Sequence, residues 1–126
     1  MKFSLSWIIN DDGGNTHLVD LPTIGYYLKL LKNSSGSITL DRLDNEIGAI
    51  SLQVLSDKNQ YLLTLGEDNG SEYIVRSYFN KLAKGEMIDI LGDNWDARHL
   101  IYDYDIVINA FKSFYITGDV SRDLLS

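Results

Sequence analysis

Two apolar stretches separated by a short polar segment dominate the middle of the sequence. Residues 61–65 and 73–79 consist mainly of aromatic, β-branched and aliphatic residues, the types that favour β-strands. Between them stands Asn69-Gly70, a dipeptide that strongly indicates a tight hairpin turn. Because both stretches have apolar residues at consecutive positions, we expect both faces of this strand pair to be covered and the pair to lie in the middle of a sheet.

Runs of alternating apolar and polar residues, and one short apolar run, predict further strands. They are expected at residues 3–9, 37–41, 50–54 and 87–91. Short connections between the strands favour an antiparallel meander over residues 50–79. The remaining segments are predicted to be connections: a polar, glycine-rich loop at 10–15, a charged connection at 42–48, a loop at 80–86 and a polar loop at 92–99.

Two segments carry apolar residues at three- and four-residue steps, the spacing typical of a helix with one buried face. The first covers about residues 21–32 and follows Asp20, a residue type that caps helix N-termini. The second covers about residues 104–116, follows Asp103 and ends before Gly118, where a C-terminal glycine is expected. We expect both helices to pack on the sheet.

Length and composition fit one domain. A chain of 126 residues with 44% hydrophobic and 23% charged residues has the size and balance of a single globular domain, and not of a disordered segment. No linker rich in proline or glycine divides the sequence, and no internal repeat is present. We therefore predict an α+β fold over residues 1–126, in which an antiparallel sheet of about six strands, with the meander at 50–79 at its centre, carries the two helices.

The acidic balance limits the classes of partner. A formal net charge of −7 argues against direct binding to nucleic acid, because phosphate recognition depends on clustered lysine and arginine. An acidic protein attracts basic proteins instead, although acidity also serves solubility.

The sequence also bears on compartment. It has no cysteine, which excludes disulfides, thiolate nucleophiles and zinc sites with cysteine ligands. No apolar run reaches the roughly 18 residues of a membrane-spanning segment. The N-terminus lacks the apolar region of a secretion signal. We expect a cytoplasmic protein that does not act at a membrane.

Candidate catalytic residues are few and lie in one segment. Asp93, Asp96 and His99 could form an acid–base group, because an acid three residues from a histidine can orient it. No nucleophile, phosphate-binding or zinc-protease motif accompanies them. The loop at 10–15 lacks the spaced acidic ligands of a calcium loop. We expect no enzyme, no cofactor and no metal site, with a small enzyme built on these three residues as an alternative.

Acidic and aromatic residues in the predicted loops favour a binding role. Acidic residues steer the encounter with a basic partner, and aromatic residues supply much of the interface energy. Loops at one end of a sheet can converge on one surface. The residues predicted to bind a partner are Asp11, Asp12, Glu67, Asp68, Glu72, Asp93, Trp95 and Asp96. Most other aromatic residues are expected in the core.

The order of elements resembles a known class of proteins. An early strand with Trp7 precedes a predicted helix, a strand pair, the hairpin and a last helix that finishes with Phe111, Phe114 and Gly118. The stretches that carry the likeness read L-P-T-I-G-Y-Y-L-K-L-L, S-I-T-L-D, S-L-Q-V-L, Y-L-L-T-L-G and F-K-S-F-Y-I-T-G. Together they resemble the first-described class of immunity proteins from bacterial polymorphic-toxin and contact-dependent growth inhibition systems.

The resemblance implies a function without chemistry. Such a protein binds one cognate toxin domain, often a nuclease, and blocks its active site or its substrate surface. A nuclease surface is basic because it holds phosphates, so a rigid cluster of carboxylates can occupy it. An acidic adaptor, or a subunit of a larger assembly, is the second alternative beside the small enzyme.

Overall fold

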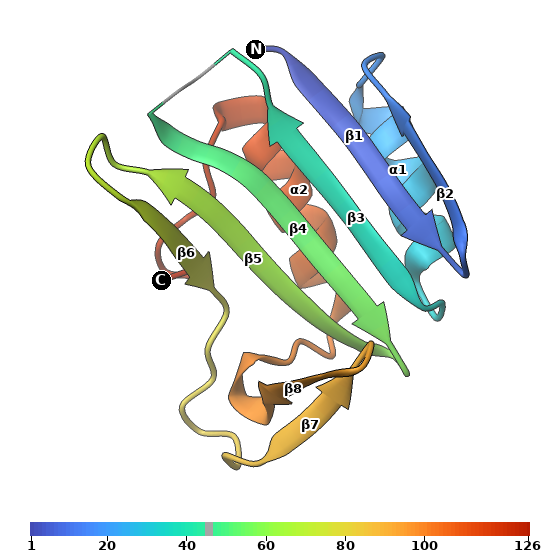
Figure 1. Ribbon diagram of the computed structural model, residues 1–126, viewed down its shortest axis with the longest axis vertical. Helices are drawn as coiled ribbons and strands as arrows, with labels where there is room; N and C mark the ends of the chain where they lie inside the picture. Colours follow the sequence, from blue (N-terminus) through green and yellow to red (C-terminus); the bar gives the residue numbers. More distant parts are fainter. Residues whose placement is uncertain (45–46) are drawn as a thin grey trace.

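A six-stranded antiparallel sheet with two helices forms most of the molecule (Figure 1). The computed structural model describes residues 1–44 and 47–126, so residues 45 and 46 of the predicted charged connection at 42–48 lie outside the described residues. The strands are β1 (Phe3–Ile9), β2 (Asp12–Thr16), β3 (Gly36–Arg42), β4 (Gly48–Asp57), β5 (Gln60–Asp68) and β6 (Tyr73–Ser77), in the order β2-β1-β3-β4-β5-β6. The predicted α+β fold and its meander, β4-β5-β6, are confirmed.

The two helices begin and end within one residue of their predicted positions. They are α1 (Leu21–Leu31) and α2 (Tyr104–Thr117). Asp20 accepts a hydrogen bond from Thr23 N (2.8 Å), which caps α1 as expected. Gly118 ends α2 with a left-handed backbone (φ 81°). Within the described residues, no helix has the length and apolarity needed to cross a membrane.

Both helices pack on the same face of the sheet and enclose the main core (Figure 1). Every second side chain of the four central strands points to this face, because side chains of a strand alternate between its two faces. The fully buried strand residues include Leu5, Ile38, Leu40, Leu52, Val54 and Leu65, and the helices add Leu28, Leu31, Val107, Phe111 and Phe114. Burial of each such side chain contributes roughly 1.5–3 kcal/mol, so the sheet and the helices stabilise each other.

The segment 10–15, predicted to be a loop, contains most of β2. Only Asn10 and Asp11 form the turn, with left-handed backbone angles (φ 49° and 70°). Gly14 lies inside β2, opposite Trp7. A glycine is required at this position because the indole of Trp7 packs directly against it: a Cβ on Gly14 would lie 2.6 Å from Cζ2 of Trp7. This glycine therefore reflects the close approach of a side chain to a strand.

The central hairpin differs from its prediction in two ways. Its connection covers four residues, because the Asn69 side chain accepts hydrogen bonds from the backbone of Ser71 (3.0 Å) and Glu72 (2.9 Å) and so stabilises a longer loop. β5 is buried on both faces, as expected. β6, however, is an edge strand, and its Tyr73 and Val75 side chains are each 60% exposed. The prediction that both strands lie in the middle of the sheet is wrong for β6.

The predicted strand at 87–91 belongs to a separate two-stranded sheet. β7 (Met87–Ile90) pairs with β8 (Asp93–Asp96), and the short 3-10 helix η1 (Ala97–His99) follows. The prediction of a polar loop over residues 92–99 is therefore wrong, because all of this segment except Gly92 forms β8 and η1.

This small sheet covers one end of the face opposite the helices. Leu55 and Leu62 are cross-strand neighbours whose side chains alternate with the helix-facing Val54 and Leu63, so they point away from the helices. They pack with residues that follow β6 in the chain: Ile88, Ile90, Trp95, Ala97 and Leu100. In the part of the chain that the structure describes, the remainder of that face carries no helix (Figure 1).

A buried arginine connects the edge strand β6 to the C-terminal segment, residues 119–126. Arg76 of β6 is 1% exposed, and its Nη1 donates to the carboxylates of Glu67 (3.2 Å) and Asp119 (2.9 Å). Arg122 donates to both Glu67 oxygens at 2.9 Å. The buried positive charge is thus matched by two carboxylates, which offsets the cost of removing it from water.

The same arginine also binds the backbone of this segment. Its Nη2 donates to Val120 O (2.6 Å) and its Nε to Leu125 O (3.0 Å). Just beyond, the backbone groups of Ser77 and Ser126 pair in both directions, at 3.3 and 3.2 Å. The C-terminal segment therefore lies against the edge of β6.

Replacing Arg76 with methionine should destabilise the protein strongly. The change leaves Glu67 buried with one partner and removes the donor for two carbonyl groups, so we expect the free energy of unfolding to fall by about 3–5 kcal/mol. Urea unfolding followed by circular dichroism measures it. Arg122→Met is the matched control, because the Arg122 side chain is 65% exposed; it should cost less than about 1 kcal/mol. Equal losses would contradict the structural role of Arg76.

Candidate functional site

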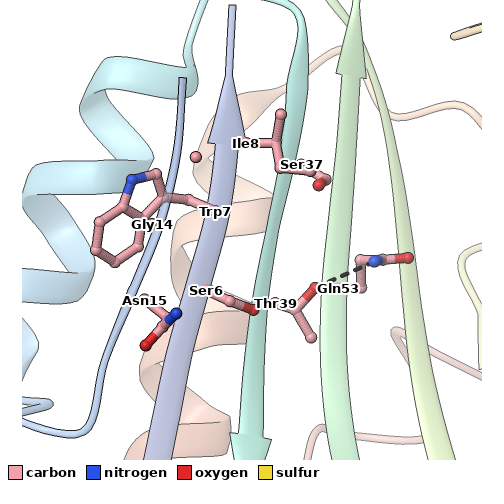
Figure 2. A pocket seen from close by; sticks show the side chains of 9 residues that line it. Ser6, Trp7, Ile8, Gly14, Asn15, Ser37, Thr39 and Gln53 are labelled. Carbon is pink, nitrogen blue, oxygen red and sulfur yellow. Dashed lines mark hydrogen bonds between the residues drawn. The ribbon is translucent and has the colours of Figure 1, made fainter. Parts of the chain in front are cut away.

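The candidate site is the part of the sheet that neither the helices nor the small sheet cover in residues 1–44 and 47–126. Its residues come from four neighbouring strands, β2, β1, β3 and β4, and are mostly polar and uncharged (Figure 2). Ser6 and Ile8 belong to β1, Thr39 to β3 and Gln53 to β4. Gln53 Nε2 donates to Thr39 Oγ1 at 3.1 Å, and this hydrogen bond fixes the orientation of both side chains.

Two open pockets meet on this face and form the outer-face groove. The first, of about 540 Å³, lies beside β2 and is lined by Ser6, Thr39 and Gln53. The second, of about 390 Å³, has an apolar lining of Ile8, Leu55 and Leu91. Ile8 and Ser37 line both, which makes the two pockets one continuous surface. Ile8 is 55% and Leu91 42% exposed, so the groove offers apolar contact area to a partner.

Carboxylates surround the apolar end of the groove. Asp11 lines the second pocket from the β1–β2 turn. Asp57, at the end of β4, accepts hydrogen bonds from Leu91 N (2.9 Å) and Ser35 Oγ (3.4 Å) and so holds the β7–β8 turn against the sheet. Asp93 is exposed and begins β8, two residues beyond Leu91, which lines the second pocket. The groove thus combines exposed apolar residues with an acidic rim.

The predicted binding residues lie at two opposite ends of the sheet. Asp11, Asp12 and Asp93 lie at the end where β1, β4 and β7 finish (Figure 1). Asp68 pairs with Gly48 at the start of β4 and Glu72 follows it in the connecting loop, which places both at the other end. The three acidic segments therefore do not converge on one surface.

Three of the predicted residues are engaged inside the molecule. Glu67 is 8% exposed and is held by the buried arginine of β6. Trp95 is half-buried in the core of the small sheet, and its Nε1 has no hydrogen-bond partner among residues 1–44 and 47–126. Asp96 receives hydrogen bonds from Nε and Nη2 of Arg98, the latter at 2.6 Å. The contacts of these three side chains are made within the protein itself and stabilise the fold.

Asp93, Asp96 and His99 do not assemble an acid–base group. The Asp96 carboxylate is bound by Arg98, whose hydrogen bonds lower the pKa of Asp96 to about 2, so it stays ionised and donates no proton near neutral pH. His99 Nδ1 lies 2.9 Å from Tyr78 O. Because a carbonyl only accepts, this nitrogen carries the hydrogen and cannot take the proton of Ser77, whose Oγ lies 3.3 Å away.

Metal ligands are not gathered either. Within the part of the chain that the structure describes, no three histidine, aspartate or glutamate side chains lie close enough to hold an ion.

Of the residues that line the outer-face groove, sequence reasoning predicted Asp11 and missed the others. Ser6, Ile8, Thr39 and Gln53 alternate with buried residues and look like any solvent-facing side of a strand. Only Ile8 carried a signal, as an apolar residue on the face of β1 that otherwise holds serines.

Comparisons with known proteins identify a family and a fold. A family model described as "Family of unknown function (DUF6911)" matches residues 3–124. No curated protein matches the sequence. A solved structure, the crystal structure of a hypothetical protein from Neisseria gonorrhoeae, is similar with a TM-score of 0.80 at 14% identity, over 95% of this chain and 90% of that chain. At this identity the likeness concerns the fold alone.

The ion pair between Asp96 and Arg98 should make stability depend on pH. Because the pKa of Asp96 is lowered from its ordinary 3.8 to about 2, the ionised carboxylate stabilises the folded state above pH 3.8, and this contribution disappears as the pH falls through about 2. Asp96→Asn should therefore be less stable than the wild type near pH 6, and the difference should shrink as the pH falls toward and below about 2. Urea unfolding at a series of pH values measures the difference. In Arg98→Gln, the pKa of Asp96, followed by NMR of its carboxyl carbon, should lie closer to 3.8. A stability difference between Asp96→Asn and the wild type that does not change with pH would contradict this assignment.

Proposed function

The chain belongs to DUF6911, a family of unknown function, and we propose from its own surface that it is an immunity protein, which binds a cognate toxin domain and blocks it without catalysing a reaction. The observation that carries the proposal is the outer-face groove, where exposed apolar residues lie beside carboxylates on a sheet face without a helix. The likeness of the sequence to immunity proteins supports the identity of the partner class.

The charge of the protein supports a basic partner. With a net charge of −7, with Asp11 lining the groove and with Asp93 exposed two residues beyond Leu91, the protein attracts a positively charged surface before contact. A toxin that acts on nucleic acid has such a surface, since it binds phosphates. Carboxylates placed there exclude the substrate by occupying its binding groups.

The apolar residues supply the affinity once contact is made. Ile8 and Leu91 present accessible apolar area between polar side chains, the composition of a protein–protein interface with an apolar centre and a polar rim. Strands carry most of the groove, so little chain has to become ordered on binding. A rigid inhibitor of this kind binds without rearranging.

A protection experiment tests the proposal. The partner is isolated from the native host by cross-linking to the tagged protein, identified, and expressed in a sensitive strain with or without this chain. We expect a basic toxin domain in a one-to-one complex, and survival only when the wild-type chain is present. The double variant Ile8→Arg/Asp11→Asn should weaken the complex at least about tenfold, which corresponds to about 1.4 kcal/mol, and should lose protection.

A matched variant separates the effect of the outer-face groove from the effect of the change in net charge. Ile116→Arg/Asp123→Asn makes the same two kinds of replacement elsewhere on the surface. Ile116 lies on α2 and is 61% exposed, and Asp123 lies in the C-terminal segment. This variant should protect as the wild type does. Equal protection by both variants would remove the outer-face groove from the interface, and survival that does not depend on the wild-type chain would refute the immunity function.

A further inference from the structure

A second groove lies on the helix side of the β1–β2 hairpin. This aromatic groove, of about 550 Å³, is lined by Trp7 and Asp12 of the hairpin and by Tyr26, Tyr27 and Leu30 of α1. Asn10, in the turn of the hairpin, lines both this groove and the outer-face groove. A molecule seated at the acidic end of the outer face can therefore reach the aromatic groove by passing around a single turn.

The aromatic side chains of this groove are fixed before any ligand arrives. The rings of Trp7 and Tyr27 are stacked, with centroids 3.8 Å apart and planes 20° apart. The other side of the indole lies against the backbone at Gly14, where a Cβ would clash with it. Tyr26 meets Tyr27 edge to face at 5.0 Å and is itself 59% exposed. The groove thus presents a preorganised aromatic wall to solvent.

Asp12 supplies the charge of the groove. It pairs with Ile9 across the hairpin, which places its side chain on the same side as Trp7 and the helix. Among the described residues that line the groove, Asp12 alone is charged. In residues 1–44 and 47–126 it forms no ion pair. Its charge is uncompensated, on a protein that is already strongly acidic.

We propose that the aromatic groove binds the guanidinium group of an arginine side chain of the partner protein. A guanidinium is planar, stacks on aromatic rings and donates two parallel hydrogen bonds to a carboxylate. Tyr26 offers the ring and Asp12 the carboxylate, on opposite walls of one groove. A lysine ammonium is more strongly hydrated and lacks the flat face, so it fits this pair less well. The partner assignment rests on the proposed function; the arginine site does not.

Titration with a small probe tests the site without the partner. The capped amino acid N-acetyl-arginine amide is added to the 15N-labelled protein, and the indole N–H of Trp7 is followed by NMR. We expect a saturable shift, with affinity at least about fivefold higher than for the amides of N-acetyl-citrulline and N-acetyl-lysine. Asp12→Asn and Tyr26→Ala should each weaken binding at least about fivefold, while Asp123→Asn should leave it unchanged. Equal affinity for citrulline or lysine, or binding that is insensitive to Asp12, would overturn the assignment.

The partner complex then tests the source of the arginine. If the probe binds and Asp12→Asn also weakens the complex with the isolated partner, the arginine belongs to that partner. A complex that Asp12→Asn leaves unchanged overturns the partner assignment, whether or not the outer-face variant Ile8→Arg/Asp11→Asn loses protection. Probe binding together with full protection by that outer-face variant refutes the proposed interface and not the arginine site.

Discussion

Packing of both helices against one face of the sheet is the interaction on which the rest of the structure depends. It uses one side of every central strand, so the residues between the buried ones must face outward. Among the described residues, the small β7–β8 sheet and the η1 segment that follows it cover part of that outward face, at one end. The position of the open surface, and the residues that line it, follow from this division of the strands.

Local chemistry made much of the fold predictable. Asp20, Asp103 and Gly118 mark helix ends through contacts with their immediate neighbours, so the sequence alone places both helices. Non-local contacts explain the failures. Gly14 is part of a strand and leaves room there for the indole of Trp7, and nothing in the neighbouring sequence indicates that contact. The edge position of β6 depends on which strands pair elsewhere in the sheet, which local patterns do not encode.

The candidate site was less predictable than the fold. Charge drew attention to acidic residues, but charge does not distinguish a free carboxylate from one that holds the structure together. Glu67 and Asp96 are of the second kind, because arginines that follow them in the sequence bind them. Ile8 and Leu91 are separated by most of the chain and meet only because β7 and β8 fold back onto the sheet. A site assembled from strand faces leaves a weak trace in sequence, whereas a site carried by one loop leaves a clear one.

Backbone pairing between Ser126 and Ser77 bears on how molecules of this protein meet one another. An open strand at the border of a sheet is a template on which further chains can stack into fibrils. Here the backbone of Ser126 pairs with Ser77 at the end of β6, and at the opposite border β2 is short, with two glycines and an aspartate. Growth of the sheet from molecule to molecule is therefore hindered at both borders. The broad outward face is left for a partner whose shape and charge complement it.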